Sequence, residues 1–252
     1  MYILASDFDG TLNNGGVSEK NRMAIKKFRQ SGNKFGIVTG RDHSMRDILV
    51  NERIEVDFII ALNGAAALNE DGSYIWCERA ENKNNAVREI AEYLRDNYGA
   101  FLSCLLQRER VERVTFKPAD DEAENAEIYK KADNIKRFTH LNSVVATDED
   151  AEKAVREINL RWGFAVNALQ NGRCIDIPPC GIDKGQGVAA YARIMDVPKE
   201  YIYCVGDNMN DMAMISRFHG CAVANAKDEI KKAAEGTYDG VWAVIDHIMG
   251  LE

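Results

Sequence analysis

The chain has 252 residues, 46% of them hydrophobic, so it can bury a sizeable core and is not a disordered chain. Its net charge of −8, from 40 acidic and 32 basic residues, argues against nucleic acid or an anionic membrane as the main partner, since both select a basic face. The six cysteines include no CxxC pair. Together with the lack of a signal-peptide pattern, they predict reduced thiols in a cytoplasmic protein without a membrane segment.

The first predicted strand ends in two carboxylates. Residues 2–5 form a short apolar run typical of a buried strand, and Asp7 and Asp9 follow before Gly10 and Thr11 open a loop. Buried acidic side chains are costly unless they leave the core or meet a cation. Because open parallel sheets bind ligands at the carboxyl ends of their strands, this stretch is either an ordinary Asp-Gly turn or one part of a site.

The chain then alternates between helix and strand. The spacing of apolar residues predicts a helix from an N-cap at Ser18 to Gly32, followed by a strand over residues 34–38. After a second helix, a further strand is expected over residues 56–61. This order predicts parallel strands joined by right-handed crossovers, whose carboxyl ends lie on one edge of a single sheet.

Both of these later strands also end in a polar residue followed by glycine. The second strand ends at Thr39-Gly40-Arg41 and the third at Asn63-Gly64. One end of this kind is typical of a turn, whereas three on the same edge indicate a site.

Beyond a short hairpin that follows the third strand, the pattern changes. Antiparallel strands are expected over residues 101–106 and 111–117, and Asn171-Gly172 is the strongest hairpin signal in the chain. Strands paired by hairpins, with helices between them, describe an α+β unit. Residues 81–178 are therefore predicted to form a separate, inserted domain.

The alternating pattern resumes after this insertion. A helix is expected over residues 181–195, an almost wholly apolar strand over 201–205, and a last short strand over 220–224. Residues 1–80 and 179–252 are therefore predicted to form one α/β domain. Its expected architecture is a Rossmann-like parallel sheet with helices on both faces.

The predicted sheet edge gathers side chains that suit a phosphate and a metal ion. They are Asp7, Asp9, Thr39, Asn63, Lys184, Asp207 and Asp211. Neighbouring carboxylates repel one another and raise one another's pKa, which a divalent cation relieves. Oxygen ligands without a His or Cys cluster indicate Mg²⁺. A metal ion, a lysine and a hydroxyl are what phosphoryl oxygens need, and a carboxylate beside them can act as the nucleophile.

In its ordered motifs the chain resembles the haloacid dehalogenase (HAD) superfamily. The four matching motifs are Asp7-Phe8-Asp9-Gly10-Thr11, Thr39-Gly40-Arg41, Lys184 in Gly-Ile-Asp-Lys-Gly, and Gly206-Asp207-Asn208-Met209-Asn210-Asp211. Asn63-Gly64 and residues 222–226 resemble the Cof-type branch, whose C2 (subtype B) cap lies between the second and third motifs. The resemblance covers the core domain, whereas the cap resembles that branch in architecture alone.

The resemblance implies catalytic, metal-binding and substrate-binding roles. The catalytic residues would be Asp7 as nucleophile, Asp9 as general acid and base, Thr39 as phosphoryl ligand and Lys184 as neutralising cation. Mg²⁺ would be bound by Asp7, the backbone carbonyl of Asp9, Asp207 and Asp211. Substrate would contact Gly40, Arg41, Asn63 and Asn210. The sequence leaves open whether Asn210 and Asp211 touch the metal directly or support its ligands.

The function implied is hydrolysis of a small phosphorylated metabolite through an aspartyl-phosphate, with a sugar phosphate or related polyol phosphate as the best match. One rival is a phosphotransferase or phosphosugar mutase, in which a substrate hydroxyl replaces water. Another is a regulatory module with Asp7 as phospho-acceptor, although Asp9 argues against a switch, which gains nothing from fast self-hydrolysis. The cap is expected to exclude macromolecules and select the substrate, and the protein to be a monomer or weak homo-oligomer.

Overall fold

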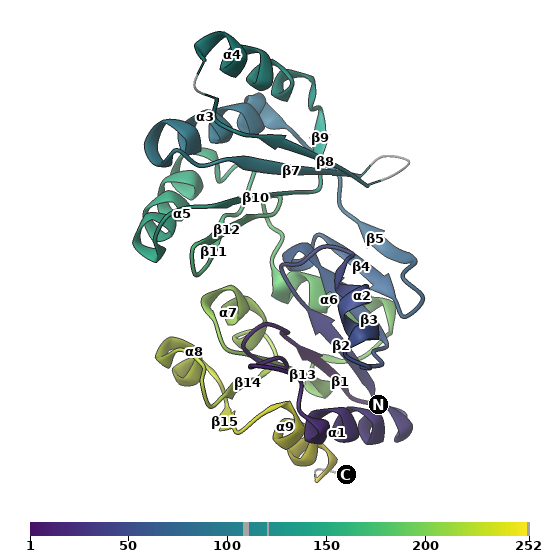
Figure 1. The fold of residues 1–252 in the computed structure, drawn as a ribbon. Coiled ribbons are helices and arrows are strands. Elements are labelled where there is room, and N and C mark those ends of the chain that lie inside the picture. Colours follow the sequence, from purple (N-terminus) through teal and green to yellow (C-terminus); the bar gives the residue numbers. More distant parts are fainter. Residues whose placement is uncertain (108–110, 120, 251–252) are drawn as a thin grey trace. The chain divides into compact units, whose positions relative to one another are not determined.

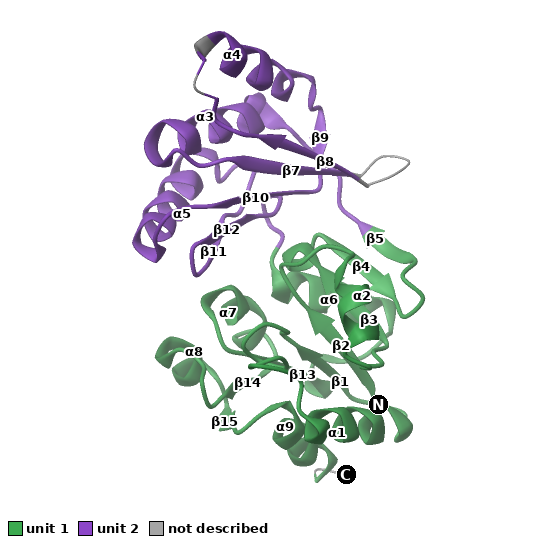
Figure 2. Ribbon diagram, viewed as in Figure 1, with its two compact units in different colours: residues 1–76, 183–252 green, residues 77–182 purple. Residues whose placement is uncertain are grey.

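The computed structural model describes residues 1–107, 111–119 and 121–250, drawn in Figure 1. The chain divides into two compact units, which Figure 2 colours separately: residues 1–76 with 183–252, and residues 77–182. The second unit extends a few residues beyond the range 81–178 expected from the sequence.

The first unit is built on an eight-stranded sheet. Its strands are β1 (Ile3–Ser6), β2 (Lys34–Val38), β3 (Phe58–Ala61), β4 (Ala66–Asn69), β5 (Tyr74–Cys77), β13 (Ile202–Gly206), β14 (His219–Val223) and β15 (Gly236–Tyr238). They lie in the order β15-β14-β13-β1-β2-β3-β4-β5. The pairs from β15 to β3 are parallel, and β4 is antiparallel to β3. The prediction that β14 is the last strand was wrong, because the three-residue β15 is too short to show a pattern in the sequence.

Helices cover both faces of this sheet. They are α1 (Glu19–Gln30), α2 (Met45–Asn51), α6 (Lys184–Ile194), α7 (Met212–Ile215), α8 (Asp228–Ala233) and α9 (Val241–Met249). From β1 the chain moves across the sheet through β2 to β3, and from β13 it moves the opposite way through β14 to β15. Right-handed crossovers therefore place α1 and α2 on one face and α7 and α8 on the other. α9 packs against α1, and α6 packs against α7 (Figure 1).

The strand order reverses direction between β1 and β13, and this switch point positions the acidic residues. Ser6 at the end of β1 pairs with Val205 of β13, and the Asp7 N–H donates to the Val205 carbonyl at 2.9 Å. Asp7 and Asp207 therefore leave two neighbouring parallel strands at the same edge. Open α/β sheets bind ligands at such switch points.

The second unit contains a five-stranded antiparallel sheet in the order β11-β12-β10-β7-β8 and a two-stranded sheet of β6 and β9. The strands are β6 (Ala80–Glu81), β7 (Leu102–Gln107), β8 (Val111–Phe116), β9 (Arg137–Phe138), β10 (His140–Val144), β11 (Leu169–Asn171) and β12 (Cys174–Ile177). The helices are α3 (Ala86–Tyr98), α4 (Glu122–Lys130) and α5 (Asp148–Trp162). The predicted antiparallel pair is β7 with β8, and the Asn171-Gly172 hairpin joins β11 to β12, so both predictions are confirmed.

One face of this antiparallel sheet packs against helices. Leu102 and Cys104 of β7 share a buried core with Val87 of α3 and Ile158 of α5. Because side chains alternate along a strand, Ser103 lies on the opposite face of the sheet. The unit thus has the layered α+β form that the sequence indicated.

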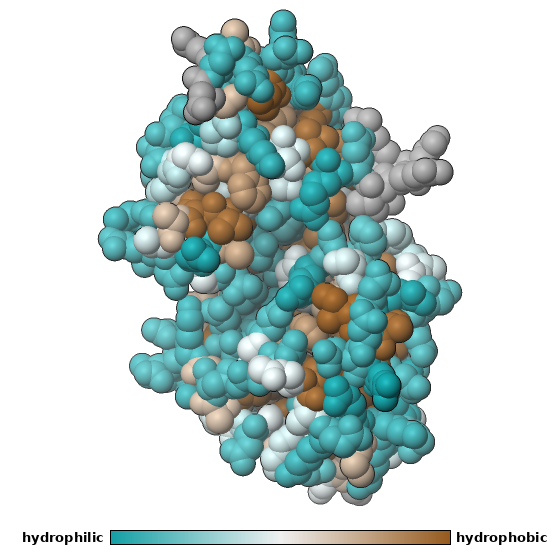
Figure 3. Space-filling view, viewed as in Figure 1, coloured by the Kyte–Doolittle hydropathy of each residue, from teal (hydrophilic) through white to brown (hydrophobic). Residues whose placement is uncertain are grey.

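The part of the surface in view in Figure 3 is largely polar. The face shown in Figure 3 is mostly hydrophilic, with smaller hydrophobic areas, in keeping with a net charge of −8. Across the residues that the structure describes, none of the helices combines the length and apolar character needed to cross a membrane.

The packing of α1 gives a test of the core. Phe28 is fully buried in this helix, whereas Met23 on the same helix is 66% exposed. Phe28→Ala should lower the free energy of unfolding by about 3–5 kcal/mol because it leaves a cavity. Met23→Ala also introduces an alanine into α1, but at an exposed position. It should change the free energy of unfolding by less than about 0.5 kcal/mol. Urea unfolding measures both, and equal losses would contradict this packing.

Candidate active site

A fully buried lysine joins two of the predicted acidic residues. Lys184 is the first residue of α6, whose N-cap Asp183 accepts a hydrogen bond from the Gln186 N–H at 2.7 Å. The Lys184 Nζ atom lies 2.6 Å from Oδ1 of Asp7 and 2.6 Å from Oδ1 of Asp211. A buried ammonium is tolerated only when it is paired and hydrogen-bonded, and here two carboxylates fill that need.

Burial disfavours the ionised form of the carboxylates. It raises the pKa of Asp7 well above the usual 3.8, with Lys184 opposing this shift and the charges of Asp211 and Asp207 adding to it. Burial likewise raises the pKa of Asp207. Burial lowers the pKa of Lys184, but Asp211 and Asp7 together raise it further, so the ammonium keeps its proton. The site therefore carries more negative charge than one lysine relieves.

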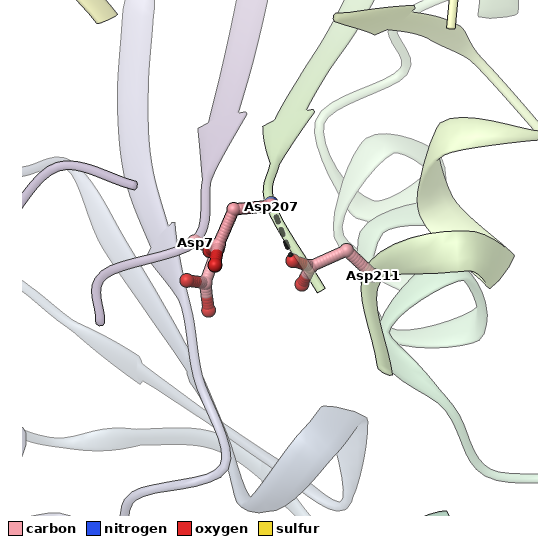
Figure 4. A group of neighbouring side chains, drawn as sticks. All are labelled: Asp7, Asp207 and Asp211. Carbon is pink, nitrogen blue, oxygen red and sulfur yellow. Dashed lines mark hydrogen bonds between the residues drawn. The ribbon is translucent and has the colours of Figure 1, made fainter. Parts of the chain in front are cut away.

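Three carboxylates form a group that suits a metal ion. Asp7, Asp207 and Asp211 each offer one oxygen atom within 4.8 Å of the others (Figure 4). Asp211 is fully buried, and its Oδ2 accepts hydrogen bonds from the N–H groups of Asp207 and Asn208 at 2.9 and 3.0 Å. Because all the donors are carboxylate oxygens, the group fits Mg²⁺ better than a softer metal.

The loop after β1 is fastened to the loop after β13. Thr11 Oγ1 donates a hydrogen bond to Asp207 Oδ1 at 2.7 Å, and Asn225 Nδ2 donates to the Gly10 carbonyl at 2.8 Å. Gly10 has φ of +86°, and a Cβ atom there would lie 2.5 Å from Asp207 Oδ2, so both conformation and space require glycine. No role was predicted for Thr11 or Asn225 from the sequence, although both lie within its recognised motifs.

The ends of β2 and β3 are also tied together. The Asn63 N–H donates to the Thr39 carbonyl and the Leu62 N–H to the Arg41 carbonyl, each at 2.9 Å. Thr39 is buried, and its Oγ1 accepts a hydrogen bond from the Arg41 N–H at 3.1 Å. Asn63 is fully buried, and among the described residues neither its side-chain oxygen nor its nitrogen has a hydrogen-bond partner. The Asn63 side-chain amide, next to Thr39, can therefore still donate and accept hydrogen bonds.

The Asp9 carboxylate lies apart from the acidic group and contacts Arg41 instead. Arg41 Nε donates to Oδ2 of Asp9 at 2.7 Å, and Arg41 Nη2 donates to Oδ1 at 2.8 Å. Both side chains are 45% exposed. The two aspartates of the first motif therefore stand in different surroundings, one buried beside a lysine and the other half exposed beside an arginine.

The remaining predicted residues lie next to these contacts. Gly40 lies between Thr39 and Arg41, and Asn210 is buried in the short 3-10 turn Met209–Asp211. The structure thus brings Asp7, Lys184, Asp207 and Asp211 into direct contact. Thr39, Arg41 and Asn63 are joined through the backbone at the neighbouring strand ends.

Residues 4–240 match the haloacid dehalogenase-like hydrolase family, so the chain belongs to this family. More narrowly, it is a phosphatase of the Cof-type branch.

Individual relatives match along nearly their whole length. The chain is 25% identical to the phosphatase YwpJ of Bacillus subtilis (strain 168), over 93% of each chain. It is 27% identical to the 5-amino-6-(5-phospho-D-ribitylamino)uracil phosphatase YwtE of the same organism, over 92% of this chain and 91% of that one. It shares its fold with the subclass IIB sugar phosphatase BT4131, with a TM-score of 0.77, 19% identity and full coverage of both chains.

The raised pKa of Asp7 predicts how pH changes the effect of Mg²⁺ on stability. Without metal, protonated Asp7 stabilises the folded state, and this contribution is lost as pH rises from the usual 3.8 through the folded-state pKa. Mg²⁺ would bind the ionised carboxylates, so the stabilisation it gives should grow over the same pH range. At 100 times its Kd, a bound ion adds about 2.7 kcal/mol.

Melting temperatures measured with chelator and with Mg²⁺ at several pH values test this expectation. Asp207→Asn, which removes one carboxylate of the group, should reduce the Mg²⁺ effect at every pH. A rise in Tm that does not vary with pH would show that Mg²⁺ does not compete with the proton on Asp7.

Proposed function

We propose that this protein is a Mg²⁺-dependent phosphomonoester hydrolase that acts on a sugar phosphate or related polyol phosphate through an aspartyl-phosphate on Asp7. The observation that carries the proposal is the buried Lys184 ammonium, 2.6 Å from Asp7, in a group of carboxylates at the switch point of the sheet. The name of YwtE, a phosphatase of a phosphorylated ribitylamino compound, supports a polyol phosphate as the substrate class.

In the first step, a carboxylate oxygen of Asp7 attacks phosphorus and the bond to the ester oxygen breaks. Asp9 gives its proton to the departing alkoxide, which is a poor leaving group without one. Lys184 favours the ionised, nucleophilic form of Asp7 and offsets charge on the phosphoryl oxygens. The products of this step are an alcohol and an aspartyl-phosphate.

In the second step, water attacks the phosphorus of the aspartyl-phosphate, and Asp9, now ionised, accepts the proton of that water. The bond from phosphorus to the Asp7 oxygen breaks, which restores the carboxylate and releases inorganic phosphate. One residue thus serves as acid and then as base, so the enzyme returns to its starting protonation state.

Asp7, Asp207 and the backbone carbonyl of Asp9 would hold Mg²⁺. The ion would supply positive charge that neutralises the carboxylates and the phosphoryl oxygens. Both oxygens of Asp211 already accept hydrogen bonds, from Lys184 and from two backbone N–H groups. We therefore assign Asp211 to the site as the residue that fixes Lys184 and the Asp207 loop.

The strand ends after β2 and β3 would receive the substrate. The Thr39 hydroxyl and the backbone at Gly40 would bind phosphoryl oxygens, as Thr39 lies at the same sheet edge as Asp7. The unused amide of Asn63 beside Thr39 supports a substrate contact there. Asn210, next to Asp211 in the sequence, is a further candidate contact.

We further propose that residues 81–178, which make up most of the second unit, form the cap and select the substrate. On the sheet face opposite the helices, Arg113 Nη1 donates to Ser103 Oγ at 2.9 Å and to Asn142 Oδ1 at 3.3 Å. Ser103 is buried whereas Arg113 is exposed. A guanidinium held on this face of the sheet offers a planar set of donors that suits the hydroxyl or acidic groups of a sugar phosphate.

Phosphate release over a panel of phosphorylated metabolites, with and without Asp7→Asn, tests the function. The variant should lower turnover at least about 10³-fold, because an amide is not a nucleophile, and should keep the fold. Without metal its Tm should equal or exceed that of the wild type, since one buried carboxylate is removed. Asp246→Asn, an exposed change on α9, should leave turnover unchanged.

The same panel separates the rival functions. Transfer of phosphate to an added second sugar, in place of release, would indicate a phosphotransferase or mutase. A long-lived phosphorylated Asp7 without turnover would indicate a regulatory module. Activity of Asp7→Asn within tenfold of the wild type would rule out Asp7 as the nucleophile.

The cap assignment gives a separate expectation. Arg113→Ala should change the ranking of substrates by kcat/KM by about tenfold or more, the effect of a lost hydrogen bond to a charged group, while the Mg²⁺ requirement stays the same. Steady-state kinetics on the substrates found in the screen measure this. A uniform loss on every substrate would place specificity in the core domain.

A further inference from the structure

The side chain of Asp9 depends on one neighbour. Within residues 1–107, 111–119 and 121–250, its carboxylate accepts side-chain hydrogen bonds from Arg41 alone, one on each oxygen. Within the same described ranges, the Arg41 guanidinium donates hydrogen bonds to Asp9 alone. Because the Asp9 side chain is 45% exposed, little packing limits its rotamers, and the arginine sets its orientation.

Arg41 is itself held by its backbone. Its N–H donates to the Thr39 hydroxyl oxygen at 3.1 Å, and its carbonyl accepts from the Leu62 N–H at 2.9 Å. The guanidinium therefore starts from a fixed point at the end of β2, two residues after Thr39. This links the orientation of Asp9 to the strand end that is proposed to bind the phosphoryl group.

The pair contributes little to stability. Exposed ion pairs are typically worth about 0–1 kcal/mol, since water solvates both partners and salt screens them. A two-point contact between a planar guanidinium and a carboxylate, however, fixes direction as well as distance. The main effect of the Arg41–Asp9 pair is therefore to orient the Asp9 carboxylate, which has to reach the ester oxygen of the substrate.

We infer that Arg41 is a positioning residue that orients the Asp9 carboxylate for proton transfer to the leaving group, and not a substrate contact as the sequence predicted. This inference rests on the proposed function, in which Asp9 is the general acid. Without Arg41, Asp9 samples several rotamers and meets the ester oxygen in only a fraction of them. The penalty then depends on how much the leaving group needs a proton.

Two aryl phosphates isolate this dependence. Phenolate is a poor leaving group and nitrophenolate a good one, while kcat/KM includes only the steps up to formation of the aspartyl-phosphate. General acid catalysis contributes about 10²–10⁴-fold, so loss of its orientation in Arg41→Gln should lower kcat/KM for phenyl phosphate about 10–100-fold. For 4-nitrophenyl phosphate the loss should stay within about threefold. Equal losses on both substrates would overturn the inference.

A double-mutant cycle decides whether Arg41 acts through Asp9. In an Asp9→Ala background, Arg41→Gln should change kcat/KM for phenyl phosphate by less than about twofold, because the group it orients is gone. If the two effects multiply, Arg41 contacts the substrate itself and the inference is wrong.

Two further variants exclude a general structural effect. Arg46→Gln alters an arginine of α2 whose guanidinium donates to the Glu70 carbonyl at 3.4 Å, and it should leave both substrates unaffected. Arg41→Lys keeps the charge but offers no planar pair of donors, so it should recover only part of the loss on phenyl phosphate. The Tm of each variant should stay close to that of the wild type. Full recovery by lysine would show that charge, and not orientation, is what matters.

The wild type provides the check on the underlying function. If it releases phosphate from either aryl ester and Asp7→Asn does not, the proposed function stands whatever the Arg41 variants show. If the wild type releases phosphate from neither aryl ester nor any metabolite of the panel, the proposed function fails, and the inference about Arg41 fails with it.

Discussion

The site depends on the fully buried ammonium of Lys184, which lies between the carboxylates of Asp7 and Asp211. Carboxylates buried at one sheet edge repel one another, and removing the cation between them would typically cost about 3–5 kcal/mol, whereas removing one of the two carboxylates leaves the lysine paired with the other. The lysine therefore holds together three segments that are far apart in the sequence. The same contact prepares the chemistry, since a cation beside a buried carboxylate favours its ionised form.

Lys184 is placed by backbone packing at the start of α6. Gly64, which follows β3, has φ of +104°, and a Cβ atom there would lie 2.3 Å from the carbonyl oxygen of Asp183. The first turn of α6 thus packs directly against the loop after β3, whose Asn63 N–H donates a hydrogen bond to the Thr39 carbonyl. Because one loop supports both the lysine and the threonine, a shift on either side of the site would be transmitted to the other.

The parts of this arrangement that are local in the sequence could be predicted. Alternating apolar runs, the Ser18 cap and the polar strand ends depend on neighbouring residues, and they gave the fold class and the core of the site. The contacts of Thr11 with Asp207 and of Asn225 with Gly10 join residues far apart, so no local pattern contains them. The burial of the Asn63 amide depends in the same way on the folded surroundings.

The two aspartates of the first motif differ only in what surrounds them. Asp7 lies at the switch point of the sheet, where burial raises its pKa and Lys184 opposes that shift. A neighbouring cation therefore favours the ionised form of Asp7. Asp9 is two residues further on, half exposed, and held by an arginine from a different strand end. A nucleophile has to stay ionised and dry, whereas an acid–base group has to exchange protons with water. In the proposed mechanism, the strand end therefore gives one type of side chain two chemical roles.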